Sequence, residues 1–312
     1  MSTSSTLSPF ADYHMHLTSS ECANIMNEKL GAEILGTYVP AFHNADEIIS
    51  VLDRSGVQKA FALSNAYQWG MDLLGLPVDQ IYDWVKFEND FTARECSQYP
   101  DRLLPFLSIH PLQDYALEEM NRCANQLGLR ALKLHFTNSN VDLRNPQHLE
   151  SIKKVFAKAV ELDIPVLLHF MSRNPEFGAV DAAILIDEII AHHPTLKIQM
   201  AHLGSGGLGD SMIKVFDTFI QRYETNPLLN KNNCKMDLAA VISDGSKPLT
   251  APLSLEQCQY ITDQIRRWGV EHVLFATDWP IFEPNEFENN IRTMLKLTEE
   301  EVNTLLSNRW LF

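Results

Sequence analysis

The sequence predicts a single domain over residues 1–312 with an α/β fold of the (β/α)8 TIM-barrel class. Eight short apolar runs alternate with segments in which apolar residues recur at helical spacing. Most of these runs are apolar on both faces, which is typical of parallel strands covered by helices. Eight such units in 312 residues favour a closed barrel over an open, doubly wound sheet.

The expected strands are distributed along the whole chain, at residues 10–17, 59–64, 102–110, 130–136, 165–170, 197–202, 235–242 and 272–278. Helices are expected between them, at residues 45–55, 79–99, 115–127, 146–162, 179–193, 212–223 and 255–268, and two short helices close the chain. Gly56 and Gly128 end two of these helices, because glycine readily adopts the positive φ of a helix C-cap. Residues 18–44 are expected to form a polar, irregular excursion.

Composition excludes several classes of function. The net charge of -15 argues against nucleic acid as a partner, since binding to phosphates relies on clustered Lys and Arg. No uninterrupted apolar run of roughly 18 residues and no export signal is found, so no membrane association is expected. The five cysteines are scattered without a CxxC spacing, which fits a reducing cytoplasm. We expect a cytoplasmic protein with a small-molecule substrate. The sequence is compatible with a homo-oligomer.

The first expected strand contains a candidate metal-binding pair. His14 and His16 are two residues apart on an extended segment, so their side chains project from the same side. Both imidazoles can therefore bind one metal ion. Asp12 lies on the same face and is a candidate hydrogen-bond partner for them.

Polar residues also stand at the carboxyl ends of later strands. A barrel gathers these strand ends at one face, where active sites of this fold lie. Scattered core histidines would have no reason to keep to one end of successive strands, so the set is interpreted as functional. Its members are His14, His16, His110, Lys133, His135, His169, His202 and Asp278.

The glycine-rich segment at residues 204–209 resembles a dinucleotide-binding fingerprint, because it follows a strand and precedes a helix. It follows the sixth strand instead of the first, however, and the next strand lacks an acidic residue placed to bind a ribose. A loop that allows close approach of substrate or backbone is the preferred interpretation.

Four motifs resemble the amidohydrolase superfamily, and most closely its amidohydrolase-2 branch, which includes an aminocarboxymuconate-semialdehyde decarboxylase family. The resemblance covers essentially the whole chain. The motifs are Asp12-Tyr-His-Met-His16, Leu168-His169, Ala201-His-Leu-Gly204 and Ala276-Thr-Asp-Trp-Pro280. They identify the superfamily but not the substrate, since one barrel scaffold serves many reactions.

The resemblance implies that His14, His16, His169 and Asp278 bind one divalent ion, usually Zn²⁺, with Mn²⁺ as a possibility, and that His202 is a catalytic residue nearby. Three imidazoles leave room for a water, whose pKa a bound metal lowers to about 7. Asp278 is the candidate to accept the proton of this water and to pass it to a leaving group.

Lys133 allows two interpretations. Alternation along its strand directs Lys133 and His135 into the barrel mouth, where an unmodified lysine can bind a substrate carboxylate. In binuclear members of the superfamily, a lysine on the fourth strand is carbamylated and bridges two metals, and this remains the alternative to the mononuclear site. His110 and His135 are candidate substrate contacts.

Two further residues are candidates for contacts with substrate. Arg173, which follows the fifth strand, could bind an anionic group through two hydrogen bonds. Trp279 could form a wall of the pocket.

Hydrolysis of an amide, ester or lactone carbonyl of a small anionic substrate is the preferred function. The alternative is a decarboxylase or hydratase of a small unsaturated carboxylic acid that uses the same residues. Two arginines placed to contact a carboxylate would favour decarboxylation, and only Arg173 is so placed in the sequence. A non-catalytic binding protein is disfavoured, because the expected ligand set is intact.

Overall fold

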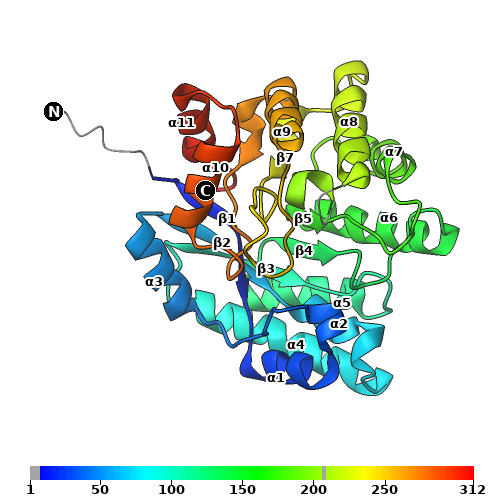
Figure 1. Cartoon of the computed structure of the whole chain (residues 1–312). Helices are drawn as coiled ribbons and strands as arrows, with labels where there is room; N and C mark the ends of the chain where they lie inside the picture. The colour runs from blue at the N-terminus through cyan, green and yellow to red at the C-terminus, as the bar shows by residue number, and fades with distance from the viewer. Residues whose placement is uncertain (1–7, 206–208) are drawn as a thin grey trace.

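The computed structural model describes residues 8–205 and 209–312, and it confirms the predicted barrel (Figure 1). Eight parallel strands form one sheet in chain order. They are β1 (Ala11–Leu17), β2 (Lys59–Ser64), β3 (Leu103–Ser108), β4 (Leu132–His135), β5 (Val166–His169), β6 (Ile198–Met200), β7 (Cys234–Asp237) and β8 (Val273–Leu274).

The sheet is nearly closed between β8 and β1. The amide of Tyr13 donates to the carbonyl of Phe275 at 3.0 Å, and the amide of His16 donates to the carbonyl of Trp279 at 3.0 Å. These bonds run past the short β8 into the segment that follows it. The barrel thus brings the first and last motifs of the sequence side by side.

Helices surround the sheet, and all the helices expected from the sequence are found (Figure 1). Those expected at residues 45–55 and 255–268 have the predicted ends, and the others have shifted ends. They are α3 (Ala45–Ser55), α4 (Val78–Cys96), α5 (Ala116–Arg122), α6 (Pro146–Glu161), α7 (Ala179–Glu188), α8 (Asp210–Thr225), α9 (Leu255–Trp268), α10 (Pro284–Met294) and α11 (Glu299–Ser307). Among the described residues, no helix is both long and apolar enough to span a membrane.

The segment expected to be irregular contains two helices, α1 (Ser20–Lys29) and α2 (Ala32–Leu35). Helix α1 begins after Ser19, whose hydroxyl oxygen accepts a hydrogen bond from the amide of Cys22 at 3.1 Å. Ser19 also donates through its amide, at 2.9 Å, and through its hydroxyl to the buried carboxyl group of Glu88 on α4. The start of α1 is therefore fixed to the helical layer of the barrel.

The core has two layers, which explains where polar groups can lie. Leu132 and Leu134 of β4 pack in the large apolar cluster between the sheet and the helices. Tyr13, Phe61 and similar side chains fill the barrel interior. Lys133 alternates with the two leucines and is 1% exposed, so its side chain lies inside the barrel mouth as expected.

Candidate metal centre

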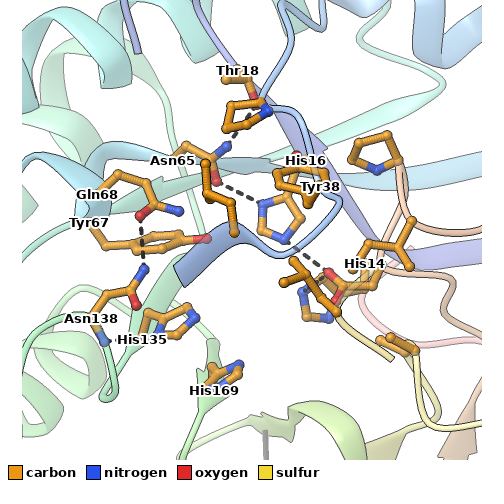
Figure 2. Close-up of a pocket in the computed structure, with 18 of the residues that line it drawn as sticks. His14, His16, Thr18, Tyr38, Asn65, Tyr67, Gln68, His135, Asn138 and His169 are labelled. Atoms are coloured by element: carbon orange, nitrogen blue, oxygen red, sulfur yellow. Dashed lines mark hydrogen bonds and ion pairs between the residues drawn. The ribbon is translucent and has the colours of Figure 1, made fainter. Parts of the chain in front are cut away.

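A cavity of about 550 Å³ lies at the carboxyl ends of the strands (Figure 2). The strand-end residues proposed from the sequence lie in its lining, apart from His110. They are His14, His16, Lys133, His135, His169, His202 and Asp278. The barrel therefore gathers side chains that are up to 264 positions apart in the sequence, from His14 to Asp278 (278 − 14), at one site.

Three of these residues form a group that fits one metal ion. Ligand atoms of His14, His16 and Asp278 all lie within 4.8 Å of one another. Oδ1 of Asp278 is 3.4 Å from Nε2 of His14 and 3.2 Å from Nε2 of His16. Asp278 adopts a positive φ of 60° after β8, a conformation that aspartate tolerates better than most residues.

The orientation of the His14 ring is set by a buried carboxylate. Nδ1 of His14 lies 3.1 Å from Oδ2 of Asp237, so the ring carries its proton on Nδ1 and donates it to Asp237. Asp237 also accepts from Nε2 of Gln199 at 2.7 Å and from the amide of His202 at 2.8 Å. The lone pair of His14 Nε2 therefore faces the cavity, as metal binding requires.

The ring of His16 is oriented in the same sense by an amide (Figure 2). Its Nδ1 lies 2.9 Å from Oδ1 of Asn65, while Nδ2 of Asn65 donates to the hydroxyl of Thr18 at 2.7 Å. Because the amide oxygen of Asn65 can only accept, His16 donates from Nδ1, and its Nε2 presents a lone pair toward Asp278.

Three acceptors thus face one another, and this arrangement fits a divalent cation. Burial lowers the pKa of His14 to about 3, with Lys133 adding to the effect, and burial also lowers the pKa of His16. Burial would raise the pKa of Asp278, but the imidazoles of His14, His16 and His202 together hold it well below its usual value. Neutral imidazoles beside a carboxylate are the forms that bind metal.

Lys133 reaches the same group. Its Nζ lies 3.1 Å from Nε2 of His14, and burial lowers the pKa of the amine to about 8 against the opposing effect of Asp278 and Asp237. Among the described residues that line the cavity, Lys133 is the only lysine, and no arginine accompanies it. Its modification by carbamylation stays a prediction.

His135 and His169 lie at the β4 and β5 side of the cavity and are arranged differently (Figure 2). Their rings stack with centroids 3.8 Å apart, and Tyr67 stacks on His135 at 4.7 Å. The amide of Asn138 donates to Nδ1 of His135 at 3.2 Å, so the proton of neutral His135 is on Nε2. His169 contributes no atom to the three-residue metal group, and its role as a ligand stays a prediction.

His202 follows β6 in a left-handed conformation, with φ of 54°. Its Nδ1 donates to the carbonyl of Ala239 at 2.6 Å, and its ring lies 5.2 Å from that of His14 and 4.9 Å from that of His169. Among the described residues, none forms a hydrogen bond to Nε2 of His202, and the residue lines the cavity. This position at the cavity suits a group that contacts the substrate. The catalytic role of His202 stays a prediction.

Three of the predicted substrate contacts lie outside the lining of the cavity, and their roles stay predictions. His110 packs so closely on the backbone that a Cβ at Gly70 would lie 2.3 Å from its ring. Arg173 is exposed and donates to the carbonyl of Thr137 at 3.0 Å. Trp279 is 3% exposed and packs against the ring of His43.

Asp12 also differs from expectation. Its carboxylate accepts from the amide of His14 and from the amide and hydroxyl of Thr277, and so joins β1 to the segment after β8. Asp237 and Asn65 take the place expected for Asp12 as partners of the imidazole rings. Asn65 directly follows the strand expected at residues 59–64, so the strand-end rule would have found it. Asp237 lies near the start of the strand expected at residues 235–242 and is a strand-end residue only in the structure, where β7 ends at Asp237.

The glycine-rich segment is described only in part. Gly204 has a φ of 86°, a conformation that glycine adopts without strain. Residues 206–208 lie outside the described residues, so the interpretation of this segment as a close-approach loop stays a prediction.

Comparison with known proteins decides the family. The amidohydrolase family model matches residues 11–308. The chain belongs to the amidohydrolase family. This amidohydrolase is 25% identical over 227 residues to gamma-resorcylate decarboxylase of Rhizobium sp. (strain MTP-10005), a match that spans 62% of this chain and 64% of the relative.

Two solved structures share the fold of this amidohydrolase. A 2,6-dihydroxybenzoate decarboxylase in complex with 2,6-dihydroxybenzoate aligns with a TM-score of 0.65 at 18% identity, over 96% of this chain and 97% of that one. The 5-carboxyvanillate decarboxylase of Novosphingobium aromaticivorans, in complex with manganese and 4-hydroxy-3-methoxy-5-nitrobenzoic acid, aligns with a TM-score of 0.66 at 15% identity, over 97% and 95%. The chain is a metal-dependent member of the family, with a divalent-metal site at His14, His16 and Asp278.

Proposed function

We propose that this amidohydrolase decarboxylates a small aromatic carboxylic acid and binds one Mn²⁺ ion for that purpose. The observation that supports this most is its similarity to gamma-resorcylate decarboxylase in a chain whose three acceptor atoms converge at one point. The similarity reverses the preference for hydrolysis that was drawn from the sequence and favours the alternative, a decarboxylase. It also favours manganese over zinc, since a structural relative binds manganese.

His14, His16 and Asp278 bind the ion in this proposal, and His169 is the fourth ligand. When bound, the ion would supply positive charge that offsets the negative charge of the acid. No rearrangement is needed for His14 and His16, since Asp237 and Asn65 already orient their rings. Among the described residues, the His169 ring contacts the rings of His135 and His202, and in this proposal it turns from them toward the ion.

The remaining polar residues of the cavity orient the acid. Lys133 pairs with a substrate oxygen, because no other lysine and no arginine is among the described lining residues. His135 donates a hydrogen bond from Nε2, since the Asn138 amide occupies its Nδ1. These two donors contact the acid from the side of β4.

The reaction breaks the bond between the ring carbon and the carboxylate. Carbon dioxide leaves, the electron pair of the broken bond stays on the ring carbon, and that carbon takes up one proton. Asp278, which rests as a carboxylate, accepts one proton from solvent and passes it to the ring carbon, because its carboxyl group lies at the centre of the site within 3.4 Å of both metal-binding imidazoles. His202 contacts the reacting group through its free Nε2.

The test uses the full chain loaded with Mn²⁺ and 2,6-dihydroxybenzoate as the probe. We expect one carbon dioxide and one 1,3-dihydroxybenzene for each acid consumed. Hydrolysis of a lactone or amide panel without release of carbon dioxide from any aromatic acid would overturn the proposal.

His202→Ala separates catalysis from metal binding in the same assay. The variant should keep its metal and lose about 10²-fold or more in turnover. If the substitution instead halves a stoichiometry of two metals per chain, His202 is a ligand of a second ion and the mononuclear site is wrong.

A further inference from the structure

Two groups of apolar side chains line the cavity beside its floor, by which we mean the polar residues around His14 at the strand ends. The polar residues Tyr38 and Thr250 lie in the same segments as these apolar groups. One group of side chains comes from α1, α2 and the turn after β2, and a second group comes from the segments after β7 and β8. The first contains Met26, Leu30, Ile34, Leu35 and Met71, and the second contains Val241, Leu249, Ala251 and Ile281. Neither group is used by the decarboxylation itself, which takes place among the histidines.

Charge is confined to the floor of the cavity. The described lining residues include one lysine and one carboxylate, Lys133 and Asp278, and both lie within 3.4 Å of Nε2 of His14. A second carboxylate on the substrate would lie between apolar walls with no cation to pair with it. Burying such an unpaired charge is costly, so the walls disfavour a dicarboxylate.

The walls also leave apolar surface uncovered. Ile34 is 39% exposed and Leu249 is 59% exposed, although both line the cavity. The cavity volume of about 550 Å³ is within the range of roughly 300–1,000 Å³ that is typical of sites for larger organic ligands. An apolar ligand group placed there would remove this surface from water, which is favourable.

The wall made by α1 is firmly attached. Ser19 at the start of the helix binds Glu88, and Leu30 and Met26 pack with Trp69 and Met71 in one apolar cluster. The wall is therefore preformed, and a ligand does not have to order it before binding.

We propose that the substrate is a monocarboxylate whose aromatic ring bears an apolar substituent, an alkyl chain of several carbons, directed away from the carboxylate and toward these two walls. The inference rests on the proposed decarboxylation, because it places the carboxylate on the floor of the cavity. Ile34 and Leu249 are then specificity-determining residues.

The experiment uses the full chain loaded with Mn²⁺ and a series of 2-hydroxybenzoates that carry hydrogen, methyl, ethyl or propyl at ring position 4. We expect kcat/KM for carbon dioxide release to rise about fourfold for each added carbon, because each buried methylene favours binding by about 0.8 kcal/mol. The rise should appear mainly in KM, since the substituent does not take part in the reaction. A carboxylate at position 4 should instead lower kcat/KM at least tenfold relative to propyl.

Two variants and a control locate the contact. Ile34→Ser and Leu249→Asn each place a polar group in one wall at a position that is already partly exposed, so the fold should survive. Each should reduce the gain per carbon from about fourfold to twofold or less. Val39→Ser is the matched control, because Val39 is 71% exposed in the segment after α2 and is not part of the lining, and it should keep the full gain.

The outcomes separate this inference from the proposed function. If all the acids release carbon dioxide but the gain per carbon is absent or reversed, the substituent inference is wrong while decarboxylation stands. If none releases carbon dioxide, the proposed function fails, and calorimetric binding of the same series to the Mn²⁺-loaded chain still decides whether affinity rises with chain length. Equal gains in wild type and both wall variants would also overturn the inference.

Discussion

The two sides of the cavity position their histidines by different means. On the side of β1, β7 and β8, Asp237 and Asn65 hydrogen-bond to Nδ1 of His14 and His16 and direct both Nε2 lone pairs at Asp278. On the side of β4 and β5, His135 and His169 are stacked 3.8 Å apart, and a backbone amide occupies Nδ1 of His135. The first side is built to accept a cation, and the second presents a hydrogen-bond donor.

This difference in hydrogen-bond partners separates two tasks among the strand-end histidines, binding of a cation and donation of a hydrogen bond. Identical residue types do not imply identical roles, because the partner of one ring nitrogen decides whether the other presents a lone pair or a proton. The comparison therefore assigns the position of the metal to the β1 side. In the proposed function, the substrate contacts and the fourth ligand, His169, lie on the β4 and β5 side.

The largest effect is expected from removing a lone pair on the metal side. His16→Ala should lose both bound Mn²⁺ and turnover, with activity down by about 10³-fold or more, since one direct ligand is gone. His135→Gln is the matched change on the other side, because glutamine keeps an N–H donor, and it should keep the metal. Metal analysis and carbon dioxide release measured on both variants test the contrast, and loss of metal from His135→Gln would break it.

A smaller effect is expected from the partner that orients a ligand. Asp237→Asn places an NH₂ group among donors, namely the side chain of Gln199 and the amide of His202, so the support of His14 is lost. Affinity for Mn²⁺ should fall about 10- to 100-fold while the fold persists. Titration with Mn²⁺ measures this, and Asp12→Asn is the control, because Asp12 contacts Thr277 instead of a ring. Equal losses in the two variants would mean that Asp237 acts only through packing.

The smallest effect concerns Glu88, whose carboxyl group holds the start of α1 through Ser19. Burial raises the pKa of Glu88 to about 7, while the unfolded chain ionises this group near its ordinary value of 4.5. Its contribution to stability is therefore fully present below about pH 4.5 and is lost as pH rises through about 7. Between about pH 6 and pH 8 this loss amounts to about 1 kcal/mol.

Glu88→Gln removes the titration and should flatten the dependence of unfolding free energy on pH over this interval. Urea unfolding at several pH values measures it. Asp83→Asn on the same helix is the control, because its side chain is 78% exposed, and it should leave the slope of the wild type unchanged. A slope in Glu88→Gln equal to that of wild type would show that Glu88 is ionised in the folded protein.

Much of this arrangement is visible in the sequence. Alternation of apolar and polar residues at β4 predicts that Lys133 faces inward, and spacing on β1 predicts that His14 and His16 share a face. Helix α1 was not predicted, because its many polar residues give no clear apolar repeat. Its start also depends on a tertiary contact between Ser19 and Glu88, which the local sequence does not reveal.

The choice of partner for each ring could not be predicted either. Asp12, Asp237 and Asn65 are all polar residues near strand ends, and only the closure of the barrel decides which of them meets an imidazole. His110 shows the converse: its position in sequence matches that of the site residues, yet it packs against Gly70 and is not among the residues that line the cavity.

The position of the metal tests the account most directly. Crystals of the Mn²⁺-loaded chain, measured on both sides of the manganese absorption edge, locate the ion by anomalous scattering. We predict one peak per chain in contact with Nε2 of His14, Nε2 of His16 and Asp278, with the ring of His169 turned toward it. Two peaks bridged by a modified Lys133, or one peak bound only by His135 and His169, would contradict the account.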